Sequence, residues 1–220
     1  TAYSHTAAYG LLERYFEEFA SKRLRPKHIQ IPISVLEANA PDFPPRRDLA
    51  IPETKADSAI SKVVNMLKKA KRPLFVLGGG ACKADVMPLI ENSNAAVFTT
   101  FAGRGLVPPT YPYFGGSFLS RPETKNVVAS SDLVLVLGSE LAEVDLWRDH
   151  LGHNAPMVRV DIDPNVLSDA QNAEVRIPMR VEDFASALLK KISGFCQKYE
   201  WNAKDFVRYR FLWRAEADHT

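Results

Sequence analysis

Apolar and polar positions follow two different periods at the start of this chain. Over residues 7–22 the apolar side chains recur at the 3.6-residue spacing of a half-buried helix, and over residues 28–36 they alternate as in a strand. The helix face consists of Leu12, Phe16, Phe19 and Ala20, and the strand face of Ile29, Ile31, Ile33 and Val35. The chain is therefore predicted to begin with a helix followed by a strand.

A proline-rich stretch interrupts this pattern. Four prolines occur among the thirteen residues 40–52. Because proline fixes φ and lacks a backbone donor, little hydrogen-bonded structure is expected there. We interpret residues 39–56 as a linker between two domains.

Beyond the linker, strands and helices alternate regularly. Strands are predicted at the apolar runs 73–77, 95–100, 132–138, 157–163 and 174–178. Helices are predicted at 58–70, 82–92, 122–130, 141–150, 166–171 and 182–193, the first capped by Asp57 and burying Ile60, Val63, Val64 and Leu67. Runs such as LVLVL are apolar on both faces, as strands covered by helices on both sides must be. The sequence predicts a doubly wound, Rossmann-like α/β domain with a parallel six-stranded sheet and helices on both faces.

The last twenty residues, 201–220, carry aromatic and charged side chains at helical spacing. If nothing covers this segment, it is expected to expose Phe206, Phe211 and Trp213 to solvent. We therefore expect it to pack on something outside these 220 residues.

Composition and charge exclude several function classes. The net charge of +2 arises from 28 basic and 26 acidic residues spread along the chain, which disfavours a nucleic-acid or membrane-surface binder, and no apolar run approaches the roughly 20 residues that cross a bilayer. Cys82 and Cys196 lie far apart, so neither a disulfide framework nor a zinc site is predicted and a reduced cytoplasmic location is expected. His28, His150 and His153 lack partners at metal-ligand spacing.

Glycine and acidic residues follow the predicted strands, where an open parallel sheet binds its ligands. Gly78, Gly79 and Gly80 either receive a phosphate on backbone amides or only turn the chain tightly, and Lys83 stands where the dinucleotide motif requires a third glycine. At the end of a later strand, Asp161 and Asp163 either accept hydrogen bonds from a ribose or cap the turn made by Pro164. Both alternatives stay open at each turn.

The order and spacing of the turns together carry a family resemblance. The segments RPKHIQIPISVL, RPLFVLGGGA, VFTTFAGRGLVP, YFGG, SSDLVLVLGSEL and VRVDIDPNVL, with the proline-rich linker after the first, resemble the central domain of thiamine-diphosphate-dependent enzymes of the acetolactate synthase and 2-oxo acid decarboxylase superfamily. The resemblance covers roughly residues 28–193.

This resemblance implies a parent with three α/β domains. Residues 1–38 would be the end of the pyrimidine-binding domain, 39–56 the linker, 57–195 the central domain, and 196–220 the connection toward the diphosphate-binding domain. It further implies that the parent is a lyase or transferase, forms a homodimer or homotetramer, and holds thiamine diphosphate and Mg²⁺ in its other two domains. The family's catalytic glutamate would precede Thr1, and its Gly-Asp-Gly magnesium motif is absent from the 220 residues, so the resemblance implies no catalytic residue in this chain.

The resemblance also implies a set of nucleotide contacts. The central domain holds FAD in the flavin-containing members, ADP in a coenzyme-A-processing relative, and nothing in several decarboxylases. Matched by motif, the candidate cofactor contacts are Gly78, Gly79, Gly80, Thr100, Phe101, Gly115, Gly116, Gly138, Ser139, Asp161 and Ile162.

Departures from the flavin pattern favour a decarboxylase-like or carboligase-like parent with a vestigial nucleotide fold. Where acetolactate synthases carry an arginine-rich loop, this chain has Glu140 and Glu143, which would repel a diphosphate, and Met179 and Arg180 replace the family's Gly-Asp pair. Together with Asp145, these two glutamates either attract a cationic 2-oxo acid, such as a guanidino-bearing one, or form a solvated helix start.

Two other classes of function are disfavoured by the sequence. A stand-alone nucleotide-binding module is disfavoured by the helix and strand that precede the linker. An NAD-consuming deacylase of related topology would require a zinc cysteine quartet, which two cysteines cannot supply.

Overall fold

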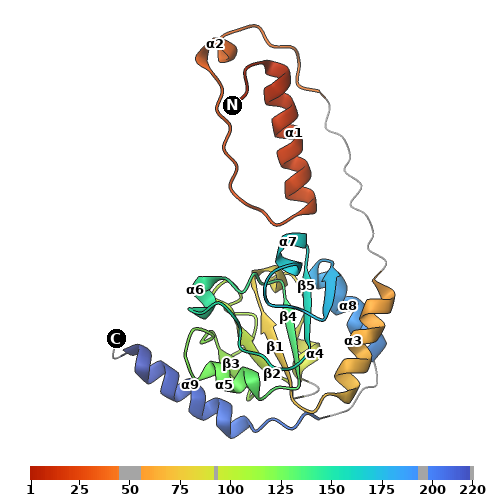
Figure 1. Ribbon diagram of the computed structural model, residues 1–220, viewed down its shortest axis with the longest axis vertical. Helices are drawn as coiled ribbons and strands as arrows, with labels where there is room; N and C mark the ends of the chain where they lie inside the picture. The colour runs from red at the N-terminus through yellow and green to blue at the C-terminus, as the bar shows by residue number, and fades with distance from the viewer. Residues whose placement is uncertain (45–55, 92–93, 193–197, 219–220) are drawn as a thin grey trace. The chain divides into compact units, whose positions relative to one another are not determined.

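The computed structural model of the protein describes residues 1–44, 56–91, 94–192 and 198–218 (Figure 1). It divides into two compact units, Thr1–Glu53 and Thr54–Thr220, which are described separately. No helix in the described ranges has both the length and the apolar character needed to cross a membrane.

The first unit contains helix α1 (His5–Ser21) and the short helix α2 (Ile33–Leu36). Ser4 caps α1 by accepting a hydrogen bond from the Ala7 amide at 3.2 Å. The returning segment is tied to the helices by the ion pair of Lys27 with Glu18 and by a 2.7 Å contact of the His5 ring with the Val35 carbonyl. Among the described residues of this unit only Ala2 and Ala8 are buried.

The strand predicted at 28–36 is wrong. Its last four residues form α2, with Pro32 as the N-terminal flanking residue. A strand is stable only beside a hydrogen-bonded neighbour, and in the described part of this unit the only backbone hydrogen bond from a distant residue to this segment is that of the Ala2 amide to the Gln30 carbonyl, at 2.8 Å. The predicted helix at 7–22 is confirmed, but Phe16 on its apolar face remains 43% exposed.

The second unit is built on one six-stranded sheet, which confirms the predicted fold class. Its strands are β1 (Pro73–Leu77), β2 (Ala96–Thr99), β3 (Phe114–Gly116), β4 (Leu133–Leu137), β5 (Met157–Asp161) and β6 (Val175–Pro178). All neighbours are parallel, and the order is β3-β2-β1-β4-β5-β6. Every residue of β1 and β4 is buried, as their continuous apolar runs require.

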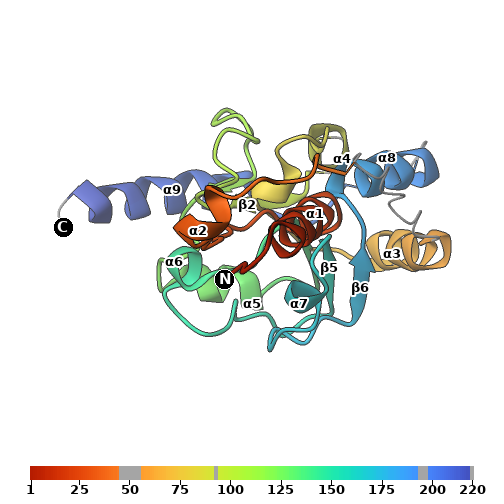
Figure 2. The ribbon, with the colours of Figure 1, turned by 90° about the horizontal axis from the view of Figure 1, so that it is seen from above.

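Helices cover both faces of this sheet (Figure 2). They are α3 (Asp57–Lys69), the 3₁₀ turn η1 (Gly79–Ala81), α4 (Met87–Glu91), α5 (Thr124–Ala129), α6 (Glu143–Leu146), α7 (Pro164–Leu167), α8 (Val181–Ile192) and α9 (Ala203–Asp218). Helices α3, α4 and α8 lie on one face, and α5 and α7 on the other. The predicted inward face of α3 is confirmed, since Ile60, Val63, Val64 and Leu67 are buried.

Three helix predictions differ from the structure, one of them the helix predicted at 166–171, which instead spans Pro164–Leu167 as α7. The helix predicted from residue 82 begins only at Met87, where Pro88 occupies the first turn, the position at which proline is tolerated. The helix predicted over 141–150 shrinks to α6 because Leu141 and Trp147 on either side have φ of 51°. Asp57 does not cap α3: the flanking residue is Ala56, with no side-chain hydrogen bond.

Helix α9 packs along the edge strand β3. Phe206 and Trp213 are each 1% exposed and contact Phe98 of β2, with ring centroids 6.4 and 6.0 Å away, so this segment packs on the sheet of the chain itself, which corrects the expected partner. Phe211 on the outer face is 74% exposed, as predicted. The Arg210 guanidinium donates to the Phe114 carbonyl of β3. The helix thus covers a strand edge that would otherwise be free to pair.

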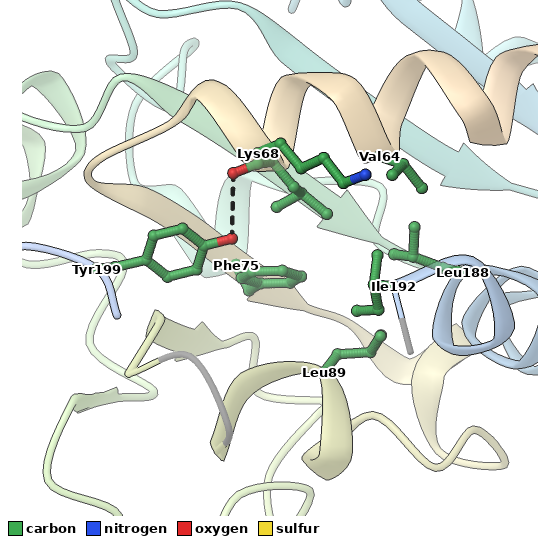
Figure 3. Close-up of a pocket in the computed structure, with 8 residues that line it drawn as sticks. Val64, Lys68, Phe75, Leu89, Leu188, Ile192 and Tyr199 are labelled. Atoms are coloured by element: carbon green, nitrogen blue, oxygen red, sulfur yellow. Dashed lines mark hydrogen bonds between the residues drawn. The ribbon is translucent and has the colours of Figure 1, made fainter. Parts of the chain in front are cut away.

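The core closes where α3, α4, α8 and β1 meet (Figure 3). A residual cavity of about 10 Å³ remains there, lined by Val64, Phe75, Leu89 and Leu188, and the Tyr199 hydroxyl donates to the Leu67 carbonyl at 3.4 Å beside it. A volume of this size holds at most one water, so the cavity is a packing gap rather than a ligand site. Burial raises the pKa of the Tyr199 phenol.

Candidate functional site

The candidate residues after β1, β2, β4 and β5 meet at one edge of the sheet, because parallel strands end on the same side. Hydrogen bonds tie neighbouring turns together: the Thr100 amide donates to the Leu77 carbonyl at 3.0 Å, and the Gly138 amide to the Val160 carbonyl at 2.8 Å. The sequence-predicted turns therefore form one continuous surface at the carboxyl edge.

Close backbone contact explains the glycines of this edge. A Cβ at Gly80 would lie 2.8 Å from the Gly138 Cα, and a Cβ at Gly138, whose φ is +63°, would lie 2.6 Å from the Gly80 Cα. At Gly78 an added Cβ would overlap the Gly138 carbonyl oxygen, and at Gly103 it would overlap the Leu77 carbonyl oxygen. These turns pack backbone against backbone, which only glycine permits.

The amides of the triple-glycine turn are largely engaged within the protein. The Gly78 amide donates to the Leu137 carbonyl and the Gly80 amide to the Gly138 carbonyl, both at 2.9 Å. The following amides, of Ala81 and Cys82, donate to carbonyls of the turn itself at 3.0 and 3.2 Å. A phosphate cradle requires amides that are free to point at the ligand. Of the two readings of this turn, the geometry supports the tight turn.

Cys82 does not lie at a helix N-terminus. It follows η1, is exposed, and its Sγ lies 3.5 Å from the Ala102 carbonyl oxygen.

The turn after β2 and the glycines of β3 are partly buried by their own contacts. Thr100 is buried, and its Oγ1 accepts from the Gly103 amide at 3.2 Å, whereas Phe101 is 43% exposed. Gly115 and Gly116 lie within β3 rather than in a turn after it, and Gly115 faces the Phe98 ring of β2. They therefore sit at the margin of the edge.

The aspartates after β5 are engaged in local turns. Asp161 is buried, and its Oδ1 accepts from the Asp163 amide at 2.9 Å, while Ile162 between them is half-buried. Asp163 caps α7 by accepting from the Asn165 amide at 3.0 Å, with Pro164 as the first helical residue. The capping alternative for Asp163 is therefore confirmed.

The acidic residues after β4 have separate roles. Asp145 Oδ1 accepts from the Phe101 amide at 2.9 Å and so links the turns after β2 and β4. Glu143 is exposed at the start of α6, and Glu140 is half-buried. Val144 and Trp147 beside them are 63% and 79% exposed. At α6 this loop therefore presents Glu143, Val144 and Trp147 to solvent.

Arg148 fixes this loop, a role that the sequence pattern did not reveal. Its Nη1 donates to the carbonyls of Leu119 at 2.6 Å and Leu146 at 3.1 Å, and its Nη2 to that of Leu151 at 3.0 Å. Its Nε donates to the His150 carbonyl at 3.0 Å. Burial lowers the pKa of this guanidinium. One cation therefore serves four backbone acceptors that would otherwise lack a protein donor.

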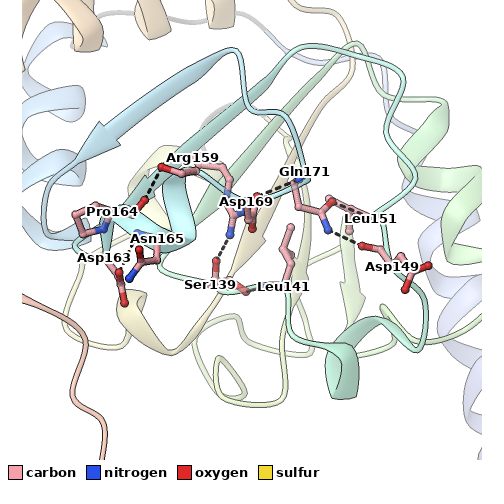
Figure 4. A network of polar contacts seen from close by, with 11 residues as sticks. Ser139, Leu141, Asp149, Leu151, Arg159, Asp163, Pro164, Asn165, Asp169 and Gln171 are labelled. Atoms are coloured by element: carbon pink, nitrogen blue, oxygen red, sulfur yellow. Dashed lines mark hydrogen bonds and ion pairs between the residues drawn. The ribbon is translucent and has the colours of Figure 1, made fainter.

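A second arginine, Arg159, also has a structural role that the sequence pattern did not reveal. Figure 4 shows the polar network to which it belongs. It lies in β5, is 1% exposed, donates to the Ser139 carbonyl at 2.6 Å, and pairs with Asp169. Ser139 is buried, and its Oγ accepts from the Leu141 amide at 2.9 Å. A single charged residue inside an apolar central strand was the available sequence signal, since a buried charge requires a partner.

Gln171 extends the same network to the far end of the loop. Its amide accepts from the Leu151 backbone at 3.1 Å and donates to the Asp149 carbonyl at 2.9 Å, while Asp169 accepts from its backbone at 3.0 Å. The loop between β4 and β5 is thus held from both sides by buried polar groups.

The residues at this edge fit a diphosphate poorly. Most of the turn amides are engaged within the protein, and the loop after β4 exposes the carboxylate of Glu143, whereas a diphosphate favours positive charge. Nor do the described ranges contain a group of three or more His, Cys, Asp or Glu side chains placed to hold a metal ion.

Comparison with known proteins gives a consistent picture. Residues 60–188 match the sequence family described as "Thiamine pyrophosphate enzyme, central domain". The chain is 34% identical over 189 residues to the probable 2-ketoarginine decarboxylase AruI of Pseudomonas aeruginosa, covering 83% of this chain and 33% of that protein. It is 32% identical over 132 residues to a pyruvate decarboxylase of Candida albicans, covering 54% of this chain and 23% of that protein. The chain spans a third or less of these relatives.

A solved structure shares the fold. The crystal structure of benzoylformate decarboxylase from Polynucleobacter necessarius aligns with a TM-score of 0.60 at 19% identity, covering 78% of this chain and 33% of that one. At this identity the likeness concerns the fold alone.

Proposed function

Because the chain belongs to the family of thiamine pyrophosphate enzyme central domains, we propose that it is the middle domain of a thiamine-diphosphate-dependent enzyme that decarboxylates a 2-oxo acid. In such a parent the cofactor supplies the electron sink, and the protein positions it between domains. The domain's contribution would be a rigid scaffold and a loop that faces the substrate, with residues 1–38 as part of the neighbouring domain and residues 39–56 as the linker. The parent would act as a homo-oligomer, with thiamine diphosphate and Mg²⁺ held outside this chain.

The observation that carries this proposal is the way the carboxyl edge is filled. Gly78, Gly80 and Gly138 pack against one another, and their amides serve the protein itself. This arrangement favours a decarboxylase-type domain without a nucleotide over a flavin-type domain. The two curated relatives described above are both named as decarboxylases.

For the substrate we propose a 2-oxo acid with a cationic end group. Glu143 is exposed on a loop that Arg148 and Asp145 hold in place, so its carboxylate would be preorganised to receive a guanidinium. The relative that aligns over 83% of this chain is named for 2-ketoarginine, a guanidino acid.

The test is a decarboxylation screen with the full-length parent on a guanidino 2-oxo acid and a neutral 2-oxo acid of equal length. We expect Glu143→Gln to raise KM for the cationic substrate about tenfold, because one charge-assisted hydrogen bond is lost. KM for the neutral substrate should stay unchanged. Glu174→Gln, an exposed acid paired with Lys62 away from this edge, is the matched control. Equal preference for the two substrates in the wild type would contradict the substrate proposal.

The alternative function is a domain that carries FAD or ADP through Gly79, Thr100, Ser139 and Ile162. It is distinguished by purifying the 220-residue chain and recording its visible spectrum, followed by calorimetric titration with FAD and ADP. A yellow protein, or saturable binding of either nucleotide that a bulky residue at Gly79 abolishes, would replace the scaffold proposal.

A further inference from the structure

A second cavity lies away from the carboxyl edge, between α5 and the start of α9. Its volume is about 350 Å³, within the range of small-molecule sites. Arg72, directly before β1, lines it together with Glu123, Asn126, Trp201, Asp205 and Tyr209. Because Arg72 precedes the strand that Gly78 follows, the cavity is at the amino edge of the sheet.

Arg72 is held in place on one side of this cavity. The Asp132 carboxylate accepts from the backbone amides of Lys71 at 2.7 Å and Arg72 at 3.0 Å. The guanidinium lies over the Trp201 ring, 4.3 Å from its centroid, and Trp201 is itself anchored by a 2.8 Å hydrogen bond to the Pro73 carbonyl. Stacking and anchoring of this kind preorganise an arginine for planar, two-point recognition of a carboxylate.

The hydrogen-bonding capacity of Arg72 is mostly unused. Its guanidinium makes one long contact, from Nη2 to Ser130 Oγ at 3.3 Å, and its buried Nε has no acceptor. Within the described part of the chain no carboxylate forms an ion pair with it. Since the Nη groups make only this one contact, an external carboxylate that accepts from them would be a favourable partner.

The opposite charge is also present and also unpaired. Glu123 and Asp205 line the same cavity, are exposed, and form no ion pair with any described residue. Tyr209 and Trp201 also line the cavity, with the Trp201 ring under the Arg72 guanidinium and the Tyr209 ring stacked on Trp213. The cavity thus combines one cation with two carboxylates.

We propose that this cavity binds a small amino acid with a cationic side chain, whose carboxylate pairs with Arg72 and whose cationic groups face Glu123 and Asp205. L-arginine, with one carboxylate and two cations at neutral pH, matches the charges in sign and number. The site is separate from the carboxyl edge, so the inference does not depend on the decarboxylase proposal.

The experiment titrates L-arginine into the 220-residue chain by isothermal calorimetry and by tryptophan fluorescence, since Trp201 lies in the cavity. We expect saturable binding that Arg72→Gln and Asp205→Asn each weaken about tenfold or more, the scale of one charge-assisted hydrogen bond. Arg104→Gln, which alters an exposed arginine near the other edge, is the matched control and should bind as the wild type does. Circular dichroism checks that each variant is folded. If Arg72→Gln is unfolded, binding by Asp205→Asn provides the test.

Charge-deleted probes test the chemistry of recognition. Agmatine lacks the carboxylate and valerate lacks the cations, and each should bind at least about tenfold more weakly than L-arginine. Absence of saturable L-arginine binding, equal binding by agmatine, or unchanged binding in folded Arg72→Gln would overturn the proposal.

Discussion

The glycine turns and the loop between β4 and β5 lie at the same edge of the sheet but are held by opposite means. The glycine turns, at Gly78–Gly80 and Gly138, are fixed by backbone packed on backbone with no side chain between. The loop is fixed by side chains, the guanidinium groups of Arg148 and Arg159, which bind its carbonyls from within. Backbone packing excludes side chains from the glycine turns and leaves little room for a ligand. The arginine contacts leave the outward positions of the loop free to vary, so the loop is where side chains can determine a substrate preference.

The glycine turns should be the more fragile of the two regions. Gly78→Ala places a Cβ against the Gly138 carbonyl oxygen, and we expect a loss of about 4 kcal/mol in unfolding free energy, the scale of a severe core lesion. Urea denaturation measures it. Gly105→Ala is the control: its φ is +89° and nothing lies within 4 Å, so only backbone strain of about 1 kcal/mol is expected. Equal losses would mean that close packing is not what fixes Gly78.

Removing the cation from the loop should have the next largest effect. Arg148→Met retains the side-chain length but leaves the carbonyls of Leu119, Leu146 and Leu151 without their donor, at a cost of about 3 kcal/mol. Arg104→Met removes an exposed arginine that stacks on Phe101 and should stay within about 0.5 kcal/mol of the wild type. Thermal unfolding of the two variants compares them directly.

The Arg159–Asp169 pair is predicted to be coupled. Asp169→Asn leaves a buried guanidinium without its counter-ion and should cost about 2 kcal/mol, less than a fully buried pair because Asp169 is partly exposed. Adding Arg159→Met to that variant should recover part of the loss, since no unpaired charge then remains. Strictly additive losses in the double-mutant cycle would show that the two side chains act independently.

The smallest effect concerns the pH dependence of stability and His153, which lies in the loop between β4 and β5. Burial, reinforced by His150, lowers the pKa of His153, and its Nδ1 is buried without a partner. The folded chain therefore binds fewer protons than the unfolded chain between this lowered pKa and the ordinary value of about 6.5. Stability is highest above pH 6.5 and falls as acidification proceeds through the folded pKa. His153→Gln should flatten this part of a stability profile, and an unchanged slope would assign the pH dependence to other groups.

Regular structure was predictable where the pattern is local. The runs at β1 and β4 are apolar on both faces and need no knowledge of their neighbours. The strand β3 escaped prediction because it has three residues, two of them glycines, and is defined by pairing with β2. The false strand at 28–36 failed for the converse reason: its alternation was correct, but among the described residues no strand pairs with it.

At the edge, the sequence located the turns but not their contacts. Gly78 and Gly138 are sixty positions apart, and only the strand order β2-β1-β4 brings their backbones together. The cap formed by Asp163 was among the predicted alternatives because it depends on neighbouring residues. The roles of Arg148 and Arg159 were not predicted, because both bind backbone carbonyls. Every residue has a carbonyl, so the sequence carries no signal of such an acceptor.

The covering of β3 by α9 has a consequence for synthesis on the ribosome. Strand β3 emerges well before residues 203–218, so the nascent sheet must remain for a time with its hydrogen-bonding edge and the Phe98 ring uncovered. During that interval the chain is open to pairing with another unfinished copy, and the closing of α9 is the step that ends this vulnerability.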